Sequence, residues 1–254
     1  MWINKPYHRN YRDFIKWPNS GYNSRIYIID KEYSNTPEHY LRAFFILQND
    51  LQKLFEYIEP DNCNNETYSY RVHELFMRVC IEVEANFKAI FKENIYSKKE
   101  NNRNIDDYKK IDTTHHLSSY KVALPIWNEW NWIFQPFSER INGNNPSRYS
   151  AYNESKHDRQ WKFKQANFRN LINAFSGLLV LLSAQFRTEE FSPAQDTLGI
   201  NTDNYYNWIW TPAIGNFFRI EFPNDWEDGE KYEFNWNDLK EDPNRFQKIN
   251  YDNI

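Results

Sequence analysis

The stretch Leu171–Phe186, with the sequence LINAFSGLLVLLSAQF, runs for sixteen residues without a charged side chain. It is shorter than the roughly 18 to 20 apolar residues that a helix needs to cross a bilayer. Polar side chains also interrupt it, namely Asn173, Ser176, Ser183 and Gln185. We therefore expect a central core helix that begins near Trp161 or Asn167 and ends at Phe186, and we expect no membrane contact.

Two amphipathic helices are expected before this core helix, each with an apolar stripe at helical spacing. The first follows the capping candidates at 34–36, has Pro37 in its first turn and ends before Pro60. The second spans about Glu66 to Ile95, and its stripe consists of Val72, Phe76, Val79, Cys80, Val83, Phe87, Ile90 and Phe91. Packing of this stripe against the core helix predicts a mainly α protein.

The segments that flank the helical region have a different character. The alternating run Arg25–Asp30 predicts a strand, and the aromatic runs 205–210 and 217–222 predict two or three more. We therefore expect three parts: an N-terminal irregular or β segment (1–35), a helical bundle (36–187), and an aromatic-rich β or irregular C-terminal extension (188–254).

Composition narrows the function classes. The formal net charge is −4, so no overall positive field draws the chain to nucleic acid, and any such contact has to be local. The cysteines, Cys63 and Cys80, provide neither a disulfide framework nor a zinc quartet. The N-terminal residues contain no apolar signal region, so we expect a cytoplasmic protein.

Residues 97–146 lack a regular apolar pattern and contain the adjacent pair His115 and His116, with Asp112 nearby. Adjacent histidines in regular structure do not face one ion, and no HExxH spacing accompanies them. We therefore expect no metal and no cofactor.

The segment Tyr152–Arg159 gathers several reactive side-chain types into eight residues. At about 100° per residue, Asn153, Lys156 and His157 share a helix face with Tyr149 and Gln160. His157 is the natural general base near neutral pH, whereas Asn153, Lys156 and Arg159 could donate hydrogen bonds to a phosphate. The alternative is an ordinary surface helix with a structural histidine.

Aromatic rings and cations follow directly. Together with Tyr152, the side chains of Trp161, Lys162 and Lys164 predict a substrate-binding surface on which bases stack and ammonium groups meet phosphates. The alternative is an amphipathic helix whose rings face the core and whose lysines face water. Glu84, at the edge of the second helix's stripe, is expected either to support the site by pairing with Arg159 or His157, or to be a solvated rim residue.

The long paired helices, the short helix of about Ser147 to His157 with Tyr-Asn-x-x-Lys-His-x-Arg, and the apolar final helix resemble the HEPN superfamily (higher eukaryotes and prokaryotes nucleotide-binding). The resemblance covers about residues 36–187. It implies a four- or five-helix bundle that forms its cleft as a homodimer. The family signature is an arginine, four to six further residues and a histidine. Here Arg148 precedes His157 by eight intervening residues, and the nearest match is the variant Asn153-x-x-Lys156-His157.

Two functions follow from this resemblance. Many members are metal-independent ribonucleases of toxin–antitoxin or antiviral defence systems, which implies 2′-hydroxyl attack with His157, Lys156, Asn153 and Arg159 as catalytic residues. Other members have lost catalysis, which implies a module that binds a nucleotide, RNA or a partner protein of the same system. From the residues alone, a third interpretation stays open, in which the Asn-Lys-His cluster is a structural network and the function lies elsewhere.

Overall fold

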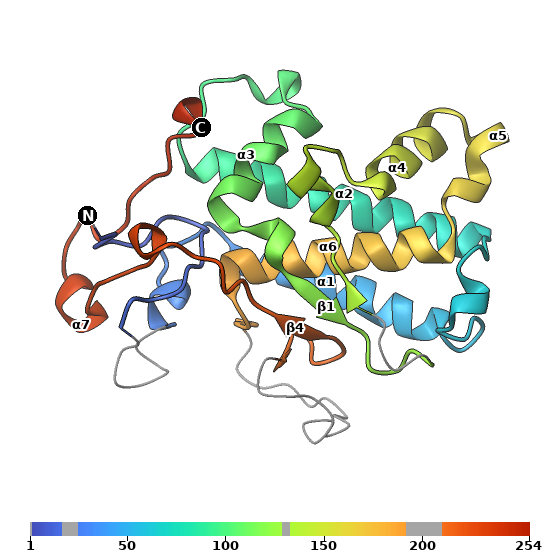
Figure 1. The fold of residues 1–254 in the computed structure, drawn as a ribbon, viewed down its shortest axis with the longest axis horizontal. Helices are drawn as coiled ribbons and strands as arrows, with labels where there is room; N and C mark the ends of the chain where they lie inside the picture. The colour runs from blue at the N-terminus through green and yellow to red at the C-terminus, as the bar shows by residue number, and fades with distance from the viewer. Residues whose placement is uncertain (1, 17–24, 129–132, 192–209) are drawn as a thin grey trace.

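The computed structural model describes residues 2–16, 25–128, 133–191 and 210–254, and of Arg159 it describes only the backbone. This part of the chain is mainly helical and contains a small antiparallel sheet of four strands (Figure 1). The predicted mainly α class is therefore confirmed.

The helix α6 (Phe168–Phe186) forms the centre of the molecule, since every side chain from Ala174 to Phe186 is buried. It packs against α2 (Tyr70–Glu93), and α1 (Pro37–Leu54) lies against both (Figure 1). The predicted core helix and its end at Phe186 are confirmed. Among the helices that the structure describes, none has the length and apolar character needed to cross a membrane.

Local signals set the helix starts: α1 begins at Pro37 as predicted, whereas α2 begins at Tyr70, after the expected start near Glu66. Pro37 occupies the first turn of α1, and the side chain of Ser69 caps α2 by accepting a hydrogen bond from the Val72 N–H. The short helix α4 (Ser147–His157) has the predicted bounds, and α5 (Arg159–Lys162) follows it.

The irregular region expected at 97–146 contains a further helix, α3 (Ile105–His115). The reason is a capping box: the Asn104 side chain accepts from backbone N–H groups of the first turn, and Asp107 accepts from the Asn104 N–H. The capping signal is present in the sequence, but α3 has only a narrow apolar face, so apolar periodicity does not predict this helix.

The sheet has the strand order β2–β1–β4–β3. Its strands are β1 (Lys121–Ala123), β2 (Ile133–Phe134), β3 (Thr211–Pro212) and β4 (Arg219–Glu221). The run 217–222 therefore does contain a strand, while residues 205–209 of the other run lie outside the described residues. Because β1 pairs with β4, the sheet joins the region expected to be a bundle to the C-terminal region.

The strand predicted at Arg25–Asp30 is wrong, because Ile26–Ile29 form a 3₁₀ helix. Tyr27 and Ile28 are both fully buried although they are consecutive. A strand would have pointed them to opposite faces, so the tight turn of a 3₁₀ helix serves this burial better.

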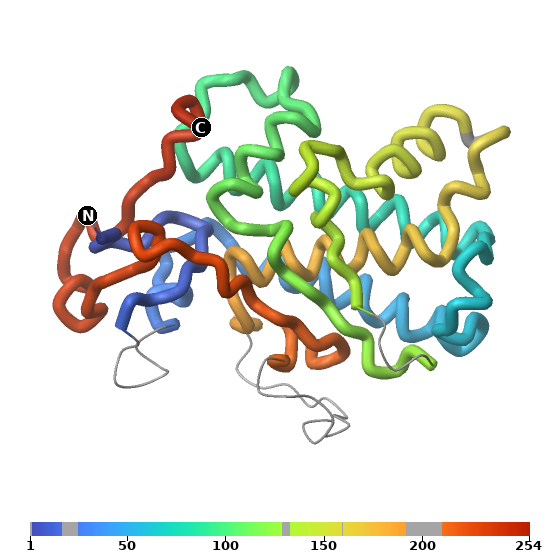
Figure 2. Tube along the Cα trace, in the orientation of Figure 1, coloured from blue at the N-terminus to red at the C-terminus, as the bar shows by residue number. Residues whose placement is uncertain are grey.

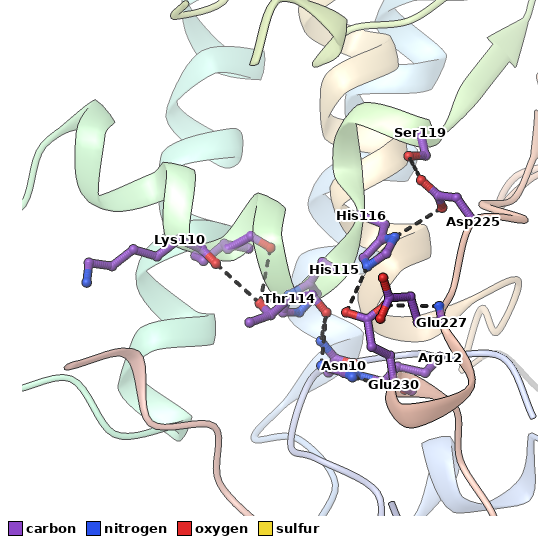
Figure 3. A network of polar contacts seen from close by, with 11 residues as sticks. Asn10, Arg12, Lys110, Thr114, His115, His116, Ser119, Asp225, Glu227 and Glu230 are labelled. Atoms are coloured by element: carbon purple, nitrogen blue, oxygen red, sulfur yellow. Dashed lines mark hydrogen bonds and ion pairs between the residues drawn. The ribbon is translucent and has the colours of Figure 1, made fainter. Parts of the chain in front are cut away.

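Residues 2–16 lie beside the C-terminal segment at one end of the bundle (Figure 2). Isolated bridges join Ile3 to Tyr232 and Tyr7 to Gln247. His116, which follows α3, also contacts the C-terminal segment: its Nδ1 atom lies 3.0 Å from an Asp225 carboxylate oxygen (Figure 3). Its ring stacks on the Trp226 ring with the centroids 3.9 Å apart.

His115 and His116 face different partners. The Nε2 atom of buried His115 lies 2.8 Å from the Arg9 carbonyl oxygen, away from the carboxylates that contact His116. In the described part of the chain, no three histidine, cysteine or acidic side chains are grouped so that they could hold a metal ion.

Candidate functional site

A cavity of about 150 Å³ lies between α2 and α4, and we call it the α2–α4 cavity. Four residues that the sequence analysis selected contribute to its wall, namely Glu84, Tyr152, Asn153 and Lys156. The remaining charged side chains of the wall are Arg103, Arg140 and Arg148. The wall thus carries four cationic side chains against the single carboxylate of Glu84, in a chain whose net charge is −4.

The burial pattern of α4 determines which of its side chains reach this cavity. Arg148, Ala151, Tyr152 and Ser155 are buried, at the i, i+3, i+4 and i+7 positions of one helix face. Asn153 is half-buried and Lys156 is exposed. These two side chains therefore lie at the rim, while Arg148 lies in the interior.

Arg148 and Arg140 approach the same aromatic ring. The Cζ atom of Arg148 is 4.5 Å from the centroid of Phe137, and that of Arg140 is 5.3 Å from it. The Nη1 atom of Arg148 donates to the Pro136 carbonyl oxygen, and Nη1 of Arg140 donates to the Tyr108 carbonyl oxygen at 2.6 Å. Each arginine is only 7% exposed.

The protein leaves these two guanidinium groups incompletely paired. The Nε and Nη2 atoms of Arg140 are buried without a hydrogen-bond partner among the described residues. None of the ion pairs in that part of the chain involves Arg140 or Arg148. Buried charged donors without acceptors are costly, so this arrangement is unusual for a purely structural arginine.

Burial disfavours the charged forms of both side chains. Burial lowers the pKa of Arg148 to about 10, and the nearby Arg140 charge lowers it further. Burial also lowers the pKa of Arg140 to about 10, against the attraction of Asp112. Both groups still carry a positive charge at neutral pH.

Part of the cavity wall is aromatic. The rings of Phe87 and Tyr108 stack with centroids 4.5 Å apart, and Phe137 packs edge-on against Phe87 at 6.2 Å. Burial raises the pKa of the Tyr108 hydroxyl well above its ordinary value, and the Glu84 charge adds to this effect. Apolar walls of this kind strengthen the attraction between the guanidinium groups and any anion that enters.

Gly177 of α6 makes room for the Arg148 side chain. A Cβ atom at this position would lie 2.9 Å from Nη2 of Arg148. An isolated glycine inside an apolar helix is a sign of close approach, so the sequence did contain a pointer to this contact. No comparable signal marks Arg140.

His157 does not line the cavity; it is the exposed last residue of α4. The helix ends there because Asp158 leaves the helical region of backbone space, with φ −132° and ψ 59°. The expectation that Gln160 continues the same helix face is therefore wrong. Of the predicted face, the cavity brings together Tyr149, Asn153 and Lys156.

The predicted rings and cations of 161–164 lie outside the cavity. Trp161 is 76% exposed, Lys162 forms an ion pair with Glu154 at 3.3 Å, and the Lys164 ammonium lies 5.8 Å above the Tyr68 ring. Trp161 therefore does not face the core as the alternative interpretation expected. A role of these residues in binding a single strand stays a prediction.

Glu84 pairs within its own helix. Its carboxylate lies 3.0 Å from the Lys88 ammonium, at i+4, and not against His157 as expected. The side chain of Arg159 lies outside the described part of the structure. Glu84 is accordingly a partly exposed rim carboxylate of the cavity.

We compared the chain with known proteins and found no relative. No family model, curated protein or solved structure matches the chain. The chemistry of the cavity is therefore the basis for inferring what the protein does.

Proposed function

We propose that the protein is a HEPN-like module that binds a nucleotide or RNA in the α2–α4 cavity without cleaving it. The observation that carries the proposal is the pair of buried guanidinium groups, Arg140 and Arg148, without a carboxylate partner among the described residues. Guanidinium forks bind phosphates with paired hydrogen bonds, and aromatic walls suit a base or a ribose. We further propose a cytosolic homodimer that belongs to a bacterial defence or toxin–antitoxin type of system.

Binding is favoured over cleavage by the position of the imidazole. Cleavage of RNA without a metal requires a base within hydrogen-bond reach of the 2′-hydroxyl. No histidine is among the described residues that line the cavity. A phosphate held by Arg140 and Arg148 would therefore lack the base that the ribonuclease hypothesis assigns to His157.

A metal-independent ribonuclease is the second candidate function. It is favoured by the exposure of both Lys156 and His157 at the end of α4. Two copies of α4 facing each other in a homodimer would bring two such pairs together, with Asn153 beside them.

Binding of a labelled single-stranded RNA that carries a terminal phosphate, with AMP as competitor, tests the proposal. Arg148→Met should weaken binding by roughly tenfold or more, because hydrogen bonds to charged groups contribute about 1.5 to 3 kcal/mol. Arg71→Met is the matched control, since Arg71 lies on α2 with an 83% exposed side chain that pairs with Glu74. Equal affinity of the Arg148→Met variant and the control would contradict the proposal.

The same RNA, incubated with the protein in EDTA, distinguishes the second candidate. We expect intact RNA. Cleavage that His157→Ala abolishes, without a change in melting temperature, would establish the ribonuclease in place of the binding module.

A further inference from the structure

We infer that the α2–α4 cavity recognises the terminal phosphate of its ligand, a phosphomonoester at the end of a nucleotide or an RNA chain. Arg140 and Arg148 would bind this phosphate, and we call the pair the seat. This inference rests on the proposed function and narrows its ligand class. An internal phosphodiester would be excluded from the seat and would bind only at the rim.

The depth of the two arginines is the first step. Both are 7% exposed, whereas Lys156 at the rim is exposed and Asn153 is half-buried. The cationic groups therefore continue from the rim into the interior.

The size of the cavity is the second step. A volume of about 150 Å³ matches cavities that accommodate one benzene-sized molecule, which is enough for a phosphoryl group. The packed rings of Phe87, Tyr108 and Phe137 form part of its wall. An internal phosphodiester is bonded to a sugar on both sides, so the cavity would have to accommodate the chain on both sides of the phosphate. A terminal phosphate is bonded to only one sugar, so the chain leaves it on one side only.

Charge balance is the third step. A phosphomonoester carries about −1.5 to −2 charges near pH 7, whereas a phosphodiester carries a single charge. Arg140 and Arg148 together carry two positive charges that lie near each other, and the described residues offer them no carboxylate within ion-pair distance. A dianion therefore neutralises both groups and relieves their repulsion.

Hydrogen bonding leads to the same ligand. The Nε and Nη2 atoms of Arg140 are buried donors without an acceptor in the described structure, so a phosphate meets them only when the guanidinium turns toward the cavity that Arg140 lines. A terminal phosphate has three free oxygens, each able to accept more than one hydrogen bond. A phosphodiester has only two such oxygens and satisfies fewer of these donors.

The experiment compares one RNA sequence in three forms: with a 5′-phosphate, with a 3′-phosphate, and with hydroxyl groups at both ends. Adenosine and AMP form a second matched pair. We expect at least one phosphorylated RNA end to bind roughly 10- to 100-fold more tightly than the hydroxyl form, and AMP to exceed adenosine by a similar factor. Arg71→Met should leave this advantage unchanged.

Two variants test the seat without removing a charge. Arg148→Lys keeps the charge but loses the fork, and Gly177→Ala places a Cβ 2.9 Å from Nη2 of Arg148. Both should reduce the phosphate advantage to less than about threefold, while the hydroxyl-ended RNA binds as it does to the wild type. Melting temperatures measured in parallel confirm that both variants are folded.

The outcomes separate this inference from the proposed function. Equal binding of all three RNAs, with Arg148→Met weakening each to the same extent, would overturn the terminal-phosphate inference and leave the binding function intact. A phosphate advantage that survives both cavity variants would also overturn it, because the phosphate would then bind elsewhere. No binding of any RNA or of AMP would overturn the proposed function itself.

Discussion

Two buried arginines, Arg9 and Arg140, differ in how completely the protein satisfies them. Arg9 donates from all three guanidinium nitrogens: Nε to Glu93 at 2.6 Å, Nη1 to Gln185 at 2.8 Å and Nη2 to the Asn35 carbonyl oxygen at 2.8 Å. Arg140 donates only from Nη1, and its other two nitrogens have no partner among the described residues. Burial is common to both, so burial does not identify the functional group. Incomplete hydrogen bonding is the feature that distinguishes Arg140 from Arg9.

The difference also separates two regions of the molecule. Around Arg9, the hydrogen-bonding groups of the N-terminal segment, α2 and α6 pair with one another. These contacts, with the bridges between the two ends of the chain, hold the terminal segments against the bundle. Arg140 and Arg148 have no carboxylate partner among the described residues, and the proposed ligand would supply the missing acceptors. We expect substitutions in the first region to change folding stability and substitutions in the α2–α4 cavity to change binding.

The largest effect is expected for Arg9→Met. Removal of this side chain leaves Glu93 and the Gln185 amide oxygen with unpaired groups in a buried site. Breaking a buried pair in this way typically costs about 3 to 5 kcal/mol of unfolding free energy. Urea denaturation measures the loss, with Arg71→Met as a control expected to change stability by less than about 0.5 kcal/mol. A loss below about 1 kcal/mol for Arg9→Met would remove the contrast between the two regions.

His115 makes the same region sensitive to acid. Burial lowers the pKa of His115 to about 3 in the folded chain. Between the ordinary histidine pKa of about 6.5 and this value, the unfolded chain binds a proton that the folded chain does not. Unfolding free energy should therefore fall as the pH falls, by about 1.4 kcal/mol per pH unit and about 3 kcal/mol in all at pH 4.5.

His115→Gln provides the control for this pH dependence. The variant has no imidazole to protonate, so its stability should decline less steeply between pH 6.5 and 4.5 than that of the wild type. Denaturation midpoints measured across this range in both proteins give the two slopes. Parallel curves would show that His115 is not the group responsible.

Arg140→Met, in the α2–α4 cavity, should change stability much less than Arg9→Met does. The substitution removes a charge whose burial is unfavourable, at the cost of one hydrogen bond to the Tyr108 carbonyl oxygen. These two contributions offset each other, so we expect a change within about 1 kcal/mol of either sign. Saturation of the wild type with AMP at 100 times its Kd should add about 2.7 kcal/mol of stability, and the variant should lose most of this gain. A destabilisation as large as that of Arg9→Met would place Arg140 among the structural arginines.

The sequence predicted those parts of the fold that depend on local signals and on one-dimensional periodicity. The apolar run Leu171–Phe186, the stripe of the second helix and the bounds Ser147–His157 all correspond to helices in the structure. The error at Arg25–Asp30 arose because burial of consecutive residues, Tyr27 and Ile28, depends on packing from distant segments. Such packing leaves no periodic trace in the local sequence.

The candidate site was predictable in part for the same reason. Helical spacing grouped Asn153 and Lys156 with Tyr149, and the structure places all three at one cavity. The grouping failed at the helix end, because the spacing argument assumed that the helix continued beyond His157. Arg140 was out of reach, since it enters the cavity from a 3₁₀ helix at Ser138–Asn142 whose position depends on tertiary contacts.

The smallest effect on stability, and the sharpest test of the comparison, is expected for Gly177→Ala. Alanine is favoured over glycine in a helix interior by about 1 kcal/mol, while its Cβ would lie 2.9 Å from Nη2 of Arg148. Because that atom is the end of a long side chain, the guanidinium can move away, and the net change should stay within about 1 kcal/mol. Gly229→Ala is the control, since a Cβ there meets no atom within 4 Å.

Calorimetric titration with AMP then separates position from charge. Gly177→Ala keeps every cationic side chain of the cavity, yet it should weaken AMP binding roughly tenfold, because the displaced guanidinium no longer meets the phosphate at hydrogen-bond distance. Gly229→Ala should bind as the wild type does. Unchanged affinity in Gly177→Ala would mean that positive charge alone attracts the ligand and that contact with α6 does not position Arg148. The incomplete pairing of Arg140 and Arg148 would then mark an electrostatic surface and not a shaped seat.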